Sequence, residues 1–187
     1  MEYAGFILQK RKNRKKKMDE YVKLAKYTVE EYVRTNKRPA LPADTPGELL
    51  EKRAGVFVSI HKKNGELRGC IGTIAPWEKN IAEEIVSNAI SASTRDPRFD
   101  AVSADELDSL EINVDVLNEP EDISSADELD VKRYGVIVSC GTRRGLLLPD
   151  LDGVDTAGQQ ISIAMRKGGI YPGEDFKLQR FEVVRHR

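Results

Sequence analysis

The sequence predicts an α+β fold, with an antiparallel sheet packed against helices. Runs of strand-like residues are joined by tight turns, as at Asn64-Gly65, and such turns favour antiparallel pairing. Segments with helical spacing lie between these runs too irregularly for repeated βαβ units. The 187 residues, 40% hydrophobic and 33% charged, suit one folded unit of ordinary globular composition.

Residues 1–17 differ in composition from the rest of the chain. A short apolar start runs into KRKNRKKK, which has seven basic residues in eight positions and no acid beside them. Repulsion within such a run predicts a disordered basic tail. Met18 could also begin the protein, so a start codon placed too early is an alternative. Residues 18–187 are then expected to form a single domain.

The predicted helices follow from periodicity and capping signals. Apolar residues three and four apart predict a helix from Met18 to about Thr35. Thr45 to Glu48 is a capping box with proline at the first helical position. Further helices are predicted over about 46–53, 77–94 and 156–167, with short helical turns at 103–106 and 125–128.

The predicted strands are runs of β-branched or alternating apolar residues. The first hairpin is GVFVSIHKKNGELRGCIGTI, centred on Asn64-Gly65. A second hairpin is predicted in GVIVSCGTRRGLLLP, with its turn in Gly141 to Gly145. Single strands are predicted over about 110–116 and 176–184.

Charge and cysteine content exclude several classes of protein. A net charge of −1 gives the whole chain no field that would draw it to nucleic acid or lipid. No apolar run approaches the roughly 20 residues of a membrane helix. Two cysteines are too few for a disulfide scaffold, and no secretory signal is recognisable, so a cytoplasmic location is expected.

The register of the first hairpin gathers reactive side chains on one face. If Asn64-Gly65 is a two-residue turn, Ser59 lies opposite Cys70 and His61 lies opposite Arg68. A thiol beside cations is the setting that activates a cysteine nucleophile. Three residues are therefore catalytic candidates: Cys70, Arg68 and His61.

Other residues of the same hairpin are candidates for binding. Glycines let a ligand or another backbone approach a strand closely, although a covering helix is an equally good reason for them. Cys70 has a similar alternative, since free cysteine is commonly a small buried hydrophobe. We name four binding candidates: Ser59, Gly69, Gly72 and Thr73.

The segment LRGCIGT, residues 67–73, resembles the signature of the AMMECR domain family, called AmmeMemoRadiSam system protein A in prokaryotes. Similar segments are GVFVSIHK before it, DPRF at 96–99, LEINVDVL at 110–117 and GLLLP at 145–149. The resemblance covers the chain from about residue 20 to the end. It implies a large lobe built from both chain ends that carries a smaller lobe, with the signature near the cleft between them.

The same resemblance implies a component, catalytic or not, of a modification system that acts with a Memo-like protein and a radical SAM protein. Neither a cofactor nor a metal is expected in this chain, which has no CxxxCxxC motif and two histidines, His61 and His186. The sequence leaves the substrate and any enzymatic activity open. Two alternatives remain: a nucleic-acid-binding module that uses the basic run and Arg143-Arg144, and a non-catalytic scaffold for the two partner proteins.

Overall fold

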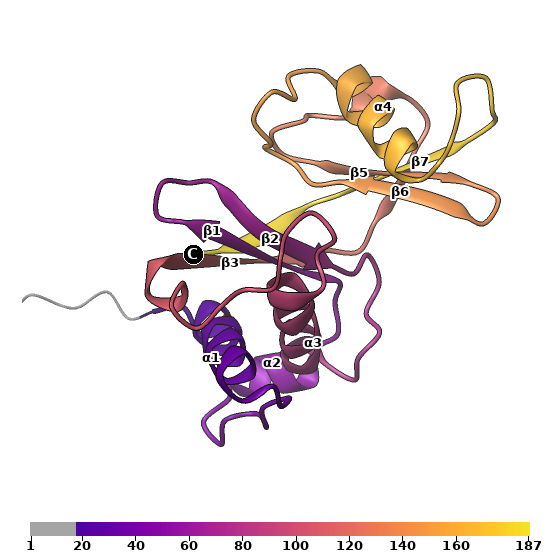
Figure 1. The fold of residues 1–187 in the computed structure, drawn as a ribbon. Helices are drawn as coiled ribbons and strands as arrows, with labels where there is room; N and C mark the ends of the chain where they lie inside the picture. The colour runs from indigo at the N-terminus through magenta and orange to yellow at the C-terminus, as the bar shows by residue number, and fades with distance from the viewer. Residues whose placement is uncertain (1–17) are drawn as a thin grey trace, which may run out of the picture.

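The computed structural model describes residues 18–187, so the predicted basic tail lies outside the described residues. Two four-stranded antiparallel sheets, each packed against helices, form two lobes (Figure 1). The large lobe contains residues 18–117 and 183–187, and the small lobe lies between them in sequence. The predicted α+β fold, with a large lobe built from both ends of the chain, is confirmed.

The large lobe places its helices on one face of its sheet (Figure 1). The two long helices pack against each other, and the second of them also packs on the strand Val56–Lys62. No helix within residues 18–187 is long and apolar enough to cross a membrane. The sheet order is β2 (Leu67–Gly72), β1 (Val56–Lys62), β3 (Leu110–Leu117) and β8 (Val183–His186), and the helices are α1 (Glu20–Thr35), α2 (Gly47–Glu51), α3 (Ile81–Thr94) and the 3₁₀ turn η1 (Leu107–Ser109).

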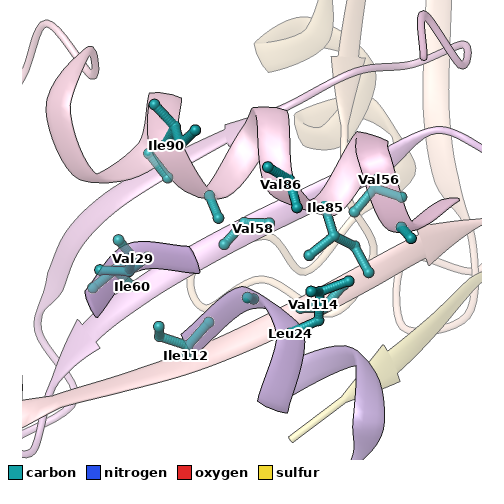
Figure 2. Packing of buried hydrophobic residues seen from close by; sticks show 14 of the residues in the cluster. Leu24, Val29, Val56, Val58, Ile60, Ile85, Val86, Ile90, Ile112 and Val114 are labelled. Carbon is teal, nitrogen blue, oxygen red and sulfur yellow. The ribbon is translucent and has the colours of Figure 1, made fainter. Parts of the chain in front are cut away.

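Alternation along β1 explains which face of the large sheet is covered. Val56, Val58 and Ile60 are fully buried, and Figure 2 shows them with the side chains of α1, α3 and β3 in one cluster. Burying each such side chain contributes about 1.5–3 kcal/mol. The intervening residues of β1 point to the opposite face, which has no helix of this lobe on it and faces the small lobe.

The small lobe repeats the arrangement with one helix on its sheet. Gly145 lets that helix approach closely, because a Cβ there would lie 1.8 Å from a helix carbonyl oxygen. The sheet order is β4 (Glu121–Ile123), β7 (Lys177–Phe181), β5 (Gly135–Cys140) and β6 (Arg143–Leu147), and the helices are α4 (Ala157–Lys167) and the 3₁₀ turn η2 (Ala126–Glu128).

Several predicted boundaries differ from the observed ones. The second long helix begins at Ile81, not near 77, because the Asn80 side chain accepts the Glu83 N–H and caps it there. The predicted strand 176–184 is two strands, β7 and β8, which belong to different sheets and are separated by Glu182. The second hairpin turns at Gly141, which has φ +57°, and β6 begins already at Arg143.

His186, although the penultimate residue, is held by contacts with the first helix. Its ring stacks on Tyr21 with centroids 3.8 Å apart, and Nδ1 lies 2.9 Å from the Asp19 carboxylate. Cys140 in β5 is half-buried, with its sulfur 3.5 Å from Nη2 of Arg143.

Candidate functional site in the interlobe cleft

The loop of the β1–β2 hairpin is one residue longer than predicted. The Lys62 N–H donates to the Glu66 carbonyl at 2.8 Å, and the Gly65 N–H donates to the Lys62 carbonyl at 2.9 Å. Three residues therefore form the loop, and Gly65 takes φ +88° as the left-handed residue that such loops require.

A bulge in β2 compensates for the extra loop residue. His61 pairs with Leu67, whereas Ser59 pairs with Cys70, so Arg68 is the additional residue between them. The predicted pair of Ser59 with Cys70 is therefore observed, and the predicted pair of His61 with Arg68 is wrong. The bulge also changes the face of the sheet on which two side chains lie. Leu67 lines the outer face, and Arg68 is directed away from it.

Arg68 is held by a loop of the large lobe instead of facing the thiol. Its Nε and Nη2 donate to the Glu106 carboxylate at 2.8 and 3.0 Å, and Nη1 donates to the Asp100 carbonyl at 2.9 Å. The Arg68 side chain is only 10% exposed. The expected contact between Arg68 and Cys70 is thus absent. Arg68 instead ties β2 to the loop that contains Asp100 and Glu106.

Three of the binding candidates have structural partners. A Cβ on Gly69 would lie 2.2 Å from a carbonyl oxygen of α3, so this glycine allows the helix to approach the strand. The Thr73 hydroxyl donates to a carboxylate of α3 at 2.6 Å. Gly72 lies under the ring of Phe57, with which a Cβ would overlap. These three residues organise the sheet and α3, and none of them lines the cleft between the lobes.

The other candidates, Ser59, His61 and Cys70, line a cleft of about 910 Å³ between the outer face of the large sheet and the small lobe. Ser59, Cys70 and Asn113 form a row across β2, β1 and β3. The Ser59 hydroxyl donates to the Cys70 sulfur at 3.2 Å. Within residues 18–187 the Asn113 amide makes no hydrogen bond, so it is available to a ligand.

Next to the row of Ser59, Cys70 and Asn113 lies a buried ion pair that was not predicted from the sequence. Asp115, whose side chain is 3% exposed, accepts hydrogen bonds from Nε and Nη2 of Arg185 at 2.7 and 2.9 Å. A usable signal was present, because Glu111, Asn113 and Asp115 alternate with the apolar residues of LEINVDVL and so share one face. The ion pair joins β3 to β8 at the cleft wall.

Cys70 is not an activated thiol in this environment. Burial raises the pKa of Cys70, and the hydrogen bond from Ser59 and the charge of Arg98 offset this only in part. The thiol is therefore protonated at neutral pH, contrary to the lowered pKa expected from an adjacent Arg68. A protonated thiol beside a hydroxyl suits binding better than nucleophilic attack.

The DPRF segment holds the signature strand in place. The Cys70 N–H donates to Asp96 at 2.9 Å, and Nε and Nη2 of Arg98 donate to the same carboxylate at 2.9 and 2.7 Å. The hydrogen bonds from Arg98 lower the pKa of Asp96 to about 2. Asp96 thus links the backbone of the signature strand to Arg98.

His61 lies at the cleft as a neutral imidazole at pH 7. Burial lowers its pKa, and the charge of Arg185 lowers it further. The sequence did not predict three further cations at the cleft: Arg98 and Arg187 in the large lobe and Lys167 at the end of α4. Arg98 lies in the family-like DPRF segment, but nothing in the local sequence marks Lys167, since only the packing of the lobes places it on this cavity.

The fold and the cleft define a two-lobed α+β protein whose signature strand lines the space between the lobes. The AMMECR1 family model matches residues 22–186, and the chain belongs to this family. A protein of Thermotoga maritima is 51% identical over 89% of this chain and 97% of its own length. The structure of the uncharacterized protein PH0010 from Pyrococcus horikoshii matches with a TM-score of 0.82 and 34% identity, over 88% of each chain.

A longer relative occurs in Clostridium acetobutylicum. It is 47% identical over 94% of this chain, and the match spans 37% of the relative's own length. The AMMECR1 region of that protein is thus one part of a longer polypeptide.

Proposed function

We propose that this protein is the substrate-binding component of a modification system and acts with a Memo-like protein and a radical SAM protein. The main observation in support of this proposal is the cleft between the lobes. Its volume of about 910 Å³ suits a small-molecule ligand, and polar side chains of β1, β2 and β3 line its floor. The two partner proteins are proposed from the resemblance of the family signature.

A binding role fits the cleft better than a catalytic one. The thiol of Cys70 is protonated at neutral pH, and the bulge removes Arg68 from the cleft. Among residues 18–187, no three His, Cys, Asp or Glu side chains converge as metal ligands would. We therefore assign the radical and metal chemistry to the partners, and orientation of the substrate to this chain.

The length of the Clostridium relative supports a role for this family in an assembly with other protein domains. There the region similar to this chain is joined to further polypeptide, which brings the two parts to a high effective concentration.

The experiment combines metabolite profiling with binding. Extracts of a strain that lacks the gene are compared with wild type, and the compound that accumulates is titrated into the purified protein by calorimetry. We expect binding that Asn113→Leu abolishes, because the amide of Asn113 faces the cleft. The matched control is Asn118→Leu, since Asn118 is exposed and lies outside the cleft. Equal binding by both variants would refute a substrate site in the cleft.

The partner proteins are tested separately by size-exclusion chromatography of the three purified products. Co-elution is expected, and three separate peaks would contradict the proposed system. Co-elution without binding of any accumulating compound would favour the scaffold alternative.

The nucleic-acid alternative depends on the basic run. A version that begins at Met18 lacks KRKNRKKK and is compared with the full chain in an RNA and DNA binding assay. Binding that survives this truncation would favour a nucleic-acid module over a small-molecule site. We expect the truncated protein to show no such binding, because the remaining domain has no basic stripe or aromatic stacking surface identified in its sequence.

A further inference from the structure

Four cationic side chains line the cleft, of which Arg98, Arg185 and Arg187 belong to the large lobe and Lys167 to the small lobe. Lys167 is the last residue of α4 in the small lobe, and Arg98 follows α3 in the large lobe. Within residues 18–187, the Lys167 side chain has neither a hydrogen bond nor an ion pair, and it is exposed at the cleft. Partial desolvation lowers the pKa of Lys167, the Cys70 thiol opposes this, and the charge of Arg98 lowers the pKa further.

Arg98 is held in a fixed orientation with one edge unused. Nε and Nη2 donate to Asp96, and Nη2 also reaches the Cys70 carbonyl at 3.3 Å. Nη1 has no partner among the described residues, and the side chain is 55% exposed. A guanidinium that is anchored on one side and open on the other is preorganised to donate to an anion.

Asp96 pairs with Arg98, whereas no carboxylate that lines the cleft pairs with Lys167 among residues 18–187. Both carboxylate oxygens of Asp115 already accept hydrogen bonds from Arg185. Asp150 forms an ion pair with Lys132 at 3.4 Å. Asp152 lines the cleft but forms no ion pair with Lys167.

We propose that the cleft holds an anionic group of its ligand, a phosphate or a carboxylate, between Lys167 of the small lobe and Arg98 of the large lobe. The inference rests on the proposed function, in which the cleft is the substrate site. Two like charges across a cavity repel each other, and an anion between them turns this repulsion into two favourable contacts. The uncharged groups of Ser59 and Asn113 on the floor would then meet the polar remainder of the ligand.

The test uses pyridoxal 5′-phosphate, which carries both an aldehyde and a phosphate. The neutral lysine amine adds to the aldehyde and releases water, and borohydride reduces the resulting imine to a stable secondary amine. Peptide mapping by mass spectrometry then gives the rate at each lysine of the full chain. We expect Lys167 to react several-fold faster than Lys177, an exposed lysine of the same lobe outside the cleft.

Protection by anions identifies the group that binds. Labelling is repeated with inorganic phosphate, with succinate and with sodium chloride at one ionic strength. Selective protection of Lys167 by phosphate supports a phosphate ligand, and selective protection by succinate supports a carboxylate. Equal rates at Lys167 and Lys177, or protection no greater than that by chloride, would overturn the proposal.

Three variants distinguish anion binding at Lys167 from a general effect of net charge. Lys167→Gln should abolish the rise in melting temperature that the protective anion causes, Lys167→Arg should restore it, and Lys177→Gln should leave it unchanged. Loss of the effect in both glutamine variants would show attraction by net charge alone and would refute a specific site. The assay uses the isolated protein, so a failure of the partner proteins to associate does not affect its result.

Discussion

Replacing Glu106 with glutamine should destabilise the large lobe, because it leaves the guanidinium of Arg68 without its counter-ion. Hydrogen bonds from Arg68 lower the pKa of Glu106 from 4.5 to about 2. Each pKa unit corresponds to about 1.4 kcal/mol, so the full shift represents about 3 kcal/mol. Because the Glu106 side chain is 29% exposed and solvent screens the pair, we expect a loss of about 2 kcal/mol in the free energy of unfolding at pH 7.

The pH dependence follows from the sign of this shift. The pKa of Glu106 is lower in the folded state than in the unfolded state, so its stabilisation is complete above about pH 4.5 and is lost as the pH falls towards 2. At pH 3 the difference between wild type and Glu106→Gln should be less than half of the difference at pH 7.

Urea unfolding followed by circular dichroism at both pH values measures these differences. The control is Glu119→Gln, which removes an exposed carboxylate that forms no ion pair within residues 18–187 and should change stability little. Wild-type stability of Glu106→Gln at pH 7, or an equal loss at both pH values, would show that the ion pair with Arg68 does not support the fold.

Three further predictions concern the hairpin, the thiol and the C-terminal strand. Gly65→Val should cost about 1–2 kcal/mol, because a β-branched residue is strained at φ +88°; unchanged urea midpoints would mean that the loop is not as described. At pH 7, Cys70 should react with a thiol reagent more slowly than free cysteine, because burial raises its pKa, and Arg68→Ala should not change the rate; a reaction faster than that of the free thiol would restore the nucleophile hypothesis. His186→Ala should lower stability by about 1 kcal/mol through the lost stacking on Tyr21, and a calorimetric melting temperature equal to that of wild type would contradict this.

The sequence was sufficient for the parts of the fold that depend on local chemistry. Capping boxes at Thr156 and Ser125 start the helix and turn where these were predicted, because a cap is satisfied within a few residues of itself. The capping box predicted at Thr45 is absent, since α2 begins after Pro46 and the Thr45 hydroxyl donates to the Pro42 carbonyl instead. The pairing of Ser59 with Cys70 was also predicted, since it needs only a count outward from the turn.

Features that depend on distant contacts were not predictable. The bulge at Arg68 exists because Glu106, far along the chain, binds the guanidinium on the inner side of the strand. The short strand β4 has no apolar alternation of its own and forms by pairing with β7. Lys167 and Arg98 lie on one cavity only because the two lobes pack together, and no spacing in the sequence records this.

The position of the small lobe between β3 and β8 determines the order in which the protein can mature on the ribosome. Leu117 pairs with Val183, so the last strand of the first sheet is translated only after every residue of the small lobe. Until then β3 is an unpaired edge and Asp115 has no arginine. The small sheet also waits, because β7 lies between β4 and β5 and ends only at Phe181, so both sheets are completed when nearly the whole chain has been translated.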